Sequence, residues 1–243
     1  MSGLRRIILL IFMFLGCVSQ PIFAKSLVIA SAAGYKKPMM ALYKVFQRQS
    51  DVKIEPIFGN MQQILSQADQ SGKIALVVGE RSFLEDSQVI FSSFRTLGQD
   101  GLALAFAKGV YLSNPDELVN PDIMRISMPN PGNAIYGKAA VEFLNNSGLY
   151  EKIKNKLFIV STVPQVSTYL VLKEIDAGFI NMTGALAVQD QIGGYLPINP
   201  SYYFPIEIVA GVVNGFKSEA GIMAFIGFLG SEDAKKILKE YGL

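Results

Sequence analysis

The chain has 243 residues, half of them hydrophobic, and its 22 Lys and Arg residues nearly balance 20 Asp and Glu residues. This length suffices for one large or two small α/β lobes. The chain has no histidine and a single cysteine, so the usual acid–base and nucleophile pairs are missing and a metal would need oxygen ligands alone. A nearly neutral charge gives no reason to expect nucleic acid or an acidic membrane as a partner. Composition therefore argues against an enzyme, a metal site and a nucleic-acid binder.

The first 24 residues have the features of a secretory signal. Arg5 and Arg6 supply the positive start, and an apolar run over residues 7–15 follows them. The run is too short to span a bilayer comfortably. A small residue, Ala24, ends the segment and marks the expected cleavage site. We therefore expect an exported, periplasmic protein from which residues 1–24 are removed.

A different processing site involves Cys17. Residues 14–17, FLGC, loosely resemble a lipoprotein cleavage box, which would attach a lipid to this cysteine. The residues before the cysteine are bulkier than such boxes prefer, so cleavage after Ala24 is the preferred interpretation. That cleavage removes the only cysteine and leaves neither a disulfide nor a thiol nucleophile.

Beyond the leader, apolar runs alternate with amphipathic segments. Strands are expected at residues 26–31, 52–58, 74–79, 124–129, 157–162 and 177–181. Helices are expected at residues 38–49, 61–70, 134–146, 163–174 and 182–191. Strands that are apolar throughout and are each followed by a helix indicate parallel sheets covered on both faces. The pattern predicts a doubly wound α/β architecture, in which ligands bind beyond the carboxyl ends of the strands.

Two β-rich runs, at residues 102–109 and 206–215, break this alternation. Helices at 217–229 and 232–241 follow the second run and close the chain. If the two runs are crossovers, the protein has two lobes, each with a mainly parallel sheet flanked by helices. The expected division is residues 25–106 plus 206–243 for lobe 1 and residues 107–205 for lobe 2. The alternative is a single sheet with antiparallel edges.

Four junctions between a strand and the following helix are candidates for a binding site. They lie at residues 31–38, 59–63, 130–138 and 180–185. A helix start leaves backbone N–H groups unpaired at the positive end of the macrodipole, which binds anions without a cationic side chain. The alternative is simple helix capping, for which Asn60, Asn133 and Asn181 are suitable residues. Four such junctions facing one cleft would converge uncharged donors on a small region.

The charged residues near these junctions have simpler interpretations. Glu85, Asp86 and Asp100 are expected to be solvated loop carboxylates. Arg81 follows the third strand and is the one cationic candidate near a junction. Its alternative role is a surface ion pair with Glu80 or Glu85. No Gly-x-Ser-x-Gly arrangement is present to support catalysis.

Several stretches resemble the molybdate-binding proteins of periplasmic ABC importers. They are LVIASAAGYKKPM, GNMQQILSQADQSGKIALVVGE, NAIYGKAAVEFL, TVPQVSTYLVLKEIDAGFINMTGA and AKKILKEYGL, which span the chain in the family's order. The resemblance implies a two-lobed periplasmic binding protein of type II, joined by two crossovers, that closes over a tetrahedral oxyanion. It also implies a monomer that delivers the anion to a membrane permease and holds no cofactor or metal beyond the metal of the anion.

The same resemblance assigns ligand-binding positions to the four junctions and to one more strand end. By position these residues are Ala33, Gly34, Tyr35, Gly59, Asn60, Met61, Asn133, Ala134, Val163 and Asn181. In typical members the first two contacts are serines and the last is a tyrosine, whereas this chain keeps neither serine and has Asn181 at the tyrosine position. Molybdate or tungstate is thus the family default, and a related oxyanion is equally compatible with these residues.

Two other functions remain open at this point. The first keeps the transport role but changes the ligand to a small neutral or zwitterionic solute, for which an arginine would usually bind the carboxylate. The second is an exported enzyme or an interaction module that has kept the fold without transport. A catalytic pair in the cleft would support the enzyme, and a cleft filled by side chains would support the module.

Overall fold

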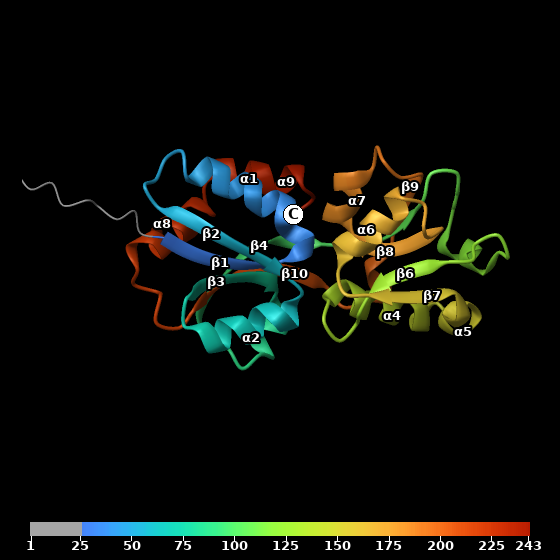
Figure 1. Cartoon of the computed structure of the whole chain (residues 1–243), viewed down its shortest axis with the longest axis horizontal. Coiled ribbons are helices and arrows are strands. Elements are labelled where there is room, and N and C mark those ends of the chain that lie inside the picture. The colour runs from blue at the N-terminus through green and yellow to red at the C-terminus, as the bar shows by residue number, and fades with distance from the viewer. Residues whose placement is uncertain (1–25) are drawn as a thin grey trace, which may run out of the picture.

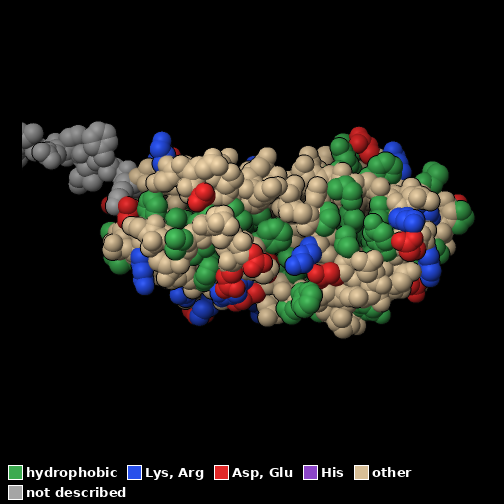
Figure 2. Space-filling model, turned by 90° about the horizontal axis from the view of Figure 1, so that it is seen from below, with side chains coloured by type: hydrophobic (Ala, Val, Ile, Leu, Met, Phe, Trp, Pro, Cys, Tyr) green, Lys and Arg blue, Asp and Glu red, His purple; other side chains and the backbone are tan. Residues whose placement is uncertain are grey.

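The computed structural model describes residues 26–243, so the expected signal segment and Cys17 lie outside the described residues. The chain forms two lobes, each built on a five-stranded sheet with helices on both faces (Figure 1). Within the described range, no helix is long and apolar enough to cross a membrane. Acidic and basic side chains are interspersed on the face seen in Figure 2, in keeping with the balanced composition.

The first sheet has the strand order β2-β1-β3-β10-β4. Its strands are β1 (Ser26–Ala32), β2 (Lys53–Gly59), β3 (Ile74–Glu80), β4 (Phe91–Asp100) and β10 (Ile206–Val213). Its helices are α1 (Lys36–Phe46), α2 (Met61–Ser71), α3 (Arg81–Glu85), α8 (Ala220–Phe228) and α9 (Glu232–Glu240). Strand β1 pairs in parallel with β2 and β3, and β10 is antiparallel to both β3 and β4. Helices α1 and α9 lie on one face of this sheet and α2 lies on the other (Figure 1).

The second sheet has the strand order β7-β6-β8-β5-β9. Its strands are β5 (Leu102–Phe106), β6 (Ile126–Pro129), β7 (Leu157–Val160), β8 (Ala177–Asn181) and β9 (Gly194–Pro197). Its helices are α4 (Ile135–Asn146), α5 (Tyr150–Ile153), α6 (Val163–Val171) and α7 (Met182–Val188). Strand β6 is parallel to β7 and β8, whereas β5 is antiparallel to β8 and β9. Short 3-10 turns complete the chain at Ala33–Tyr35, Pro115–Val119, Lys154–Lys156 and Pro200–Tyr202.

Burial explains why these segments form these elements. Strand β3 is buried along its whole length, as expected for a central strand covered on both faces. Helix α1 buries Met39, Leu42 and Phe46, whose spacing places them on one helical face. The ring of Phe46 packs edge-on against Phe225 of α8, with 5.1 Å between the ring centroids. The core of the first lobe is thus closed by a helix from the far end of the chain.

The predicted α/β two-lobed class is confirmed, with two mixed sheets rather than a single sheet. Strand β5 belongs to the second sheet, although the expected division placed residues 25–106 in lobe 1. The first crossover therefore falls at Gly101, between β4 and β5, and the second at Pro205, just before β10. Strands β4 and β9 were not expected. Strand β4 mixes polar and apolar residues, β9 has only four residues, and both lie at sheet edges, where one side faces no further strand.

Candidate functional site

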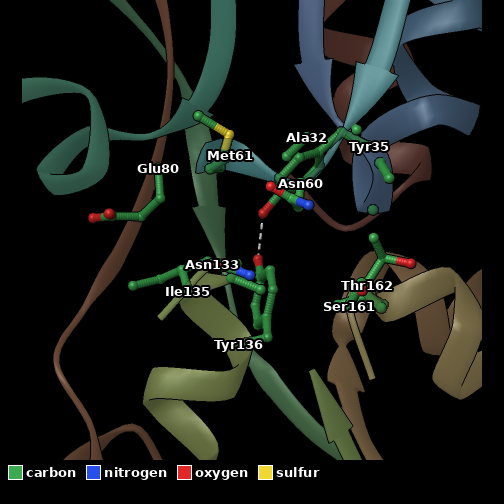
Figure 3. Close-up of a pocket in the computed structure, with 15 residues that line it drawn as sticks. Ala32, Tyr35, Asn60, Met61, Glu80, Asn133, Ile135, Tyr136, Ser161 and Thr162 are labelled. Carbon is green, nitrogen blue, oxygen red and sulfur yellow. Dashed lines mark hydrogen bonds between the residues drawn. The ribbon is translucent and has the colours of Figure 1, made fainter. Parts of the chain in front are cut away.

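The carboxyl ends of the parallel strands of both sheets face each other between the lobes and enclose a small cavity of about 30 Å³. Every residue predicted to bind ligand lines this cavity except Asn181. The further lining residues, which were not predicted from the sequence, are Ala32, Glu80, Ile135, Tyr136, Ser161 and Thr162 (Figure 3). Both lobes therefore contribute walls, and the strand-to-helix junctions bring those walls together.

Asn60 and Met61 form the wall that comes from helix α2. Asn60 is the N-cap of α2, and its Oδ1 accepts a hydrogen bond from Gln63 N at 2.9 Å. Met61 is buried, and its backbone N–H donates across the cleft to Asn133 O at 3.3 Å. The capping role considered for Asn60 is confirmed, and it leaves the amide nitrogen Nδ2 of Asn60 as the side-chain donor on this wall.

The opposite wall comes from the starts of helices α4 and α6. Ile135 and Val163 are the first residues of these helices, where backbone N–H groups lack acceptors within the helix. The N–H groups of Ser161 and Thr162 are used locally, because both donate to Gln165 Oε1, at 2.8 and 3.1 Å. The backbone donors that the second lobe can offer are therefore concentrated at the two helix starts.

Asn133 does not cap α4, because the N-cap position is held by Ala134. Its backbone N–H donates to Asn130 O at 3.0 Å, and its carbonyl oxygen accepts the bond from Met61. Figure 3 shows the side chain of Asn133 beside the ring of Tyr136, within the cavity. The side-chain amide of Asn133 is thus free of a capping role.

Behind the cavity, Asp100 collects four hydrogen bonds. Its Oδ2 accepts from Tyr136 OH at 2.7 Å, Asn181 Nδ2 at 2.9 Å and Thr183 Oγ1 at 3.1 Å, and its Oδ1 accepts from Gly101 N at 2.7 Å. The expectation that Asp100 is a solvated loop carboxylate is wrong, because it ends strand β4 and is only 7% exposed. Burial raises the pKa of Asp100 above its ordinary value, and the four hydrogen bonds oppose this shift.

Tyr35 and Tyr136 connect this carboxylate to the cavity. Their hydroxyl groups are hydrogen-bonded to each other across the lobes, as the dashed line in Figure 3 indicates. Both rings are buried. Burial, and next the charge of Asp100, raise the pKa of both tyrosines well above the ordinary value, so both hydroxyls stay protonated.

Asn181 lies outside the cavity, in the layer that supports it. The residue is fully buried, and its Oδ1 accepts from Gly184 N at 3.1 Å as the N-cap of α7. With Nδ2 bound to Asp100, its side chain is engaged on both sides. The structure therefore places Asn181 in a supporting position, where the resemblance assigned a ligand contact.

Among the described residues that line the cavity, Glu80 is the single charged one, and none is a lysine or arginine. Glu80 lines it, but its Oε2 accepts from Phe83 N at 3.0 Å and from Ser82 Oγ at 2.7 Å as the N-cap of α3. Figure 3 shows this carboxylate directed away from Thr162. Arg81 lies outside the cavity and pairs with Glu207 at 2.6 Å and Glu85 at 3.2 Å.

A larger groove of about 350 Å³ adjoins the cavity. The two share Ala33, Gly34 and Val163 in their walls. Lys36 and Lys37 line the groove from helix α1, and helices α6 and α7 form its opposite side. Lys37 Nζ donates to Ala187 O of the second lobe at 2.8 Å. The cationic side chains near the site are therefore found in the groove, beside the cavity.

The described residues hold no group of three or more His, Cys, Asp or Glu side chains that could bind a metal ion. The buried polar groups at the site are already engaged in caps or in the Asp100 network. What the cavity itself offers is helix-start amides, side-chain amides and the hydroxyls of Tyr35, Tyr136, Ser161 and Thr162. Such a set suits a small ligand rich in hydrogen-bond acceptors.

These features define a class of protein: two α/β lobes that enclose a small cavity between them. Residues 27–243 match the family model of bacterial extracellular solute-binding proteins, and the chain belongs to this family. It is 25% identical over 236 residues to the molybdate-binding protein ModA of Azotobacter vinelandii, covering 94% of this chain and 92% of that protein. It is 21% identical over 230 residues to ModA of Rhodobacter capsulatus, covering 93% of this chain and 90% of that protein.

Solved structures show the same fold. The periplasmic molybdate-binding protein of Azotobacter vinelandii matches with a TM-score of 0.81 at 19% identity, covering 89% of this chain and 97% of that one. PEB3 of Campylobacter jejuni with bound L-phospholactate matches with a TM-score of 0.71 at 17% identity, covering 89% of this chain and 98% of that one. The resemblance to molybdate-binding proteins is thus confirmed.

Proposed function

We propose that this protein is the solute-binding component of an ABC importer, and that it binds a tetrahedral oxyanion in the cavity between its lobes. The observation that carries the proposal is the meeting of helix starts from both lobes around one small cavity. The positive ends of helix dipoles and their unpaired N–H groups stabilise an anion without a cationic side chain. Relatives that match nearly the whole chain are named as molybdate-binding proteins.

The size of the cavity favours a compact ligand. Its volume of about 30 Å³ is far below the roughly 300–1,000 Å³ of sites for drug-sized molecules. Molybdate and tungstate are the first candidates, followed by sulfate and phosphate. The substrate is carried and released unchanged, which fits the scarcity of acid–base groups in the sequence. We propose a periplasmic location, action as a monomer and delivery of the anion to a membrane permease.

Titration calorimetry with the four anions tests this function. We expect at least one of molybdate, tungstate, sulfate and phosphate to bind saturably with one anion per chain. Absence of binding by all four would contradict the oxyanion proposal.

A matched pair of variants tests the location of the site. We expect Asn133→Ala to weaken anion binding about 10–100-fold, because losing a hydrogen bond to a charged group costs about 1.5–3 kcal/mol. Asn155→Ala, at an exposed asparagine in the second lobe, is the control and should bind like the unchanged protein. Equal affinities for the two variants would show that Asn133 does not bind the anion.

The adjoining groove favours a second candidate, an organic oxyanion whose charged head lies in the cavity and whose body lies in the groove. The groove is large enough for such a body, and Lys36 and Lys37 could bind a second negative group there. The structural neighbour PEB3 is described with bound L-phospholactate, which has both a phosphoryl and a carboxylate group.

Comparing L-phospholactate with inorganic phosphate tests this candidate. We expect the organic ligand to bind more tightly, and Lys36→Met to remove about tenfold of its affinity without affecting phosphate. Lys44→Met, at an exposed lysine of the same helix, is the control. If phosphate binds as tightly as L-phospholactate, the groove takes no part in recognition.

A further inference from the structure

A chain of hydrogen bonds leads from the cavity to a buried carboxylate. Tyr35 of the first lobe is bonded through its hydroxyl to Tyr136 of the second, and Tyr136 OH donates to Asp100 Oδ2 at 2.7 Å. Both tyrosines line the cavity (Figure 3). Asp100 ends β4, directly before the crossover between the lobes. The positions of the protons along these hydrogen bonds therefore decide whether the two hydroxyls can donate to a ligand or only accept from it.

An ionised Asp100 fixes these protons in one direction. A carboxylate only accepts, so the single hydroxyl proton of Tyr136 points toward Asp100. The oxygen of Tyr136 must then accept the proton of Tyr35. Each tyrosine hydroxyl has one proton to donate, and both protons are used within the chain. In this arrangement the two hydroxyls face the cavity with lone pairs, which suit a ligand's proton and repel an ionised oxygen.

A proton on Asp100 reverses the direction of donation along these hydrogen bonds. A protonated Asp100 donates to Tyr136, which frees the Tyr136 proton to point toward Tyr35. Tyr35 can then direct its own proton into the cavity. The other partners of Asp100 hold it in place throughout, because Asn181 and Gly101 donate through N–H groups that cannot reverse.

The charges around these hydrogen bonds also disfavour a fully ionised ligand. Glu80 on β3 lines the same cavity, and the described residues that line it include no Lys or Arg. The remaining polar groups packed around Asp100 are uncharged: Thr183 donates to it, and Tyr203 packs nearby, accepting from Leu102 N at 3.0 Å. Two nearby carboxylates would therefore repel a fully ionised anion in the cavity, and the cations nearest to it, Lys36 and Lys37, line the adjoining groove instead.

We propose that the site binds its oxyanion together with one proton, and that Asp100 is the positioning residue that imposes this requirement. The proton resides either on the ligand, where it donates to Tyr35 or Tyr136, or on Asp100, where it turns the hydroxyl chain toward the ligand. The chemical class selected is an oxyanion whose binding is coupled to the uptake of one proton, whichever of the two groups carries it. This inference rests on the proposed oxyanion function and specifies the protonation state that the function uses.

Proton linkage has a measurable size. If a ligand takes up one proton on binding, its affinity rises up to about tenfold for each unit by which the pH falls. Sulfate and molybdate are fully ionised near neutral pH, so a proton bound together with either anion must be taken up from solution on binding. Calorimetry in two buffers with different heats of ionisation gives the number of protons taken up for each bound anion.

The experiment compares the unchanged protein with Asp100→Asn and Tyr35→Phe, using molybdate and sulfate between about pH 6 and pH 8, which brackets neutrality. We expect the unchanged protein to take up a proton and to bind more tightly as the pH falls. Asp100→Asn, which is neutral at every pH, should take up none and lose the pH dependence. Tyr35→Phe, which keeps the ring, should lose most of the gain in affinity at the lower pH. This variant provides the test if Asp100→Asn does not fold.

Tyr43→Phe is the matched control, because Tyr43 is a buried tyrosine of α1 that lies outside the cavity. It should keep the proton uptake of the unchanged protein. Binding without proton uptake would overturn this inference and leave the oxyanion function standing. Loss of uptake in Glu80→Gln but not in Asp100→Asn would also overturn it. Absence of binding by either anion at every pH would overturn the inference and count against the function as well.

Discussion

The side-chain amide of Asn181 donates to Asp100 Oδ2 at 2.9 Å, and its carbonyl oxygen accepts from Gly184 N at 3.1 Å. One residue thus caps helix α7 and fixes the buried carboxylate at the crossover between the lobes. Both ends of its side chain are used, so the residue supports the site from behind. The consequence is that Asn181 contributes to the stability of the fold at this crossover.

We therefore expect Asn181→Ala to lower the free energy of unfolding by about 3 kcal/mol. A lost N-cap costs about 1 kcal/mol, and a lost hydrogen bond to a charged group costs about 1.5–3 kcal/mol. Urea unfolding measures the change. Asn60→Ala removes a cap that is not bonded to a carboxylate and should cost only about 1 kcal/mol. Equal losses in the two variants would contradict the role assigned to the Asn181–Asp100 bond.

Removal of the Tyr43 hydroxyl is expected to raise the stability of the protein. Its hydroxyl is buried without a hydrogen-bond partner among the described residues, and burial raises its pKa above the ordinary value. A buried polar group without a partner costs about 1–3 kcal/mol. Tyr43→Phe should therefore stabilise the protein by about 1 kcal/mol in thermal unfolding. Tyr35→Phe, which removes a bonded hydroxyl, should destabilise it by about the same amount. A loss of stability in Tyr43→Phe would indicate that this hydroxyl has a partner.

The backbone at the end of β6 lies so close to Gly137, the glycine of the NAIYGKAA stretch, that a side chain does not fit there. A Cβ at this position would lie 2.1 Å from Pro129 O, a backbone atom at the end of β6. Gly137→Ala should therefore displace the start of α4, which contains Tyr136, lowering stability by about 1–3 kcal/mol, as overpacking typically does. It should weaken anion binding as well.

Gly227→Ala is the matched control for this prediction. Gly227 also lies in a helix, α8, but a Cβ added there would have no other atom within 4 Å. The substitution should stabilise the protein by up to about 1 kcal/mol, because alanine favours the helix. Thermal unfolding of both variants checks the pair, and a neutral effect of Gly137→Ala would contradict the close approach of α4 to β6.

The buried carboxyl group of Asp100 should make the free energy of unfolding depend on pH. Burial raises its pKa in the folded state above the unfolded value, so the folded protein binds a proton at a higher pH than the unfolded chain does. The unchanged protein should therefore gain stability relative to Asp100→Asn as the pH falls from neutral toward about 4, the ordinary pKa of Asp. The gain should level off once the unfolded chain is protonated too. Urea unfolding of both proteins at several pH values measures it, and a constant difference would contradict the raised pKa.

The alternation of strands and helices was predictable because central strands are apolar throughout and the helices are amphipathic. Strand β3 and helix α1 show both signals in a few residues. The positions of the junctions followed from the same alternation, since parallel strands end at one edge of a sheet. That is why Asn60 and Asn133 were named from the sequence and meet in the structure, whereas Val163 was assigned by the family resemblance alone.

Asp100 was not predictable in this way. It ends a strand of mixed polarity, FSSFRTLGQD, whose pattern gives no sign of burial. Its partners Tyr136, Asn181 and Thr183 come from other elements, which only the packing of the second lobe against the crossover brings together. An aspartate directly before a glycine is typical of a turn at the surface. The supporting layer of the site depends on tertiary contacts that no single stretch encodes.

Tungsten diffraction tests the central claim most directly. Crystals of the protein grown with tungstate would locate the metal atom through its anomalous scattering, independently of any interpretation of the side chains. We expect one strong peak between the lobes, enclosed by Asn60, Asn133 and Val163. A peak elsewhere in a protein that binds tungstate in solution, or an empty cleft at saturating tungstate, would contradict the proposed site.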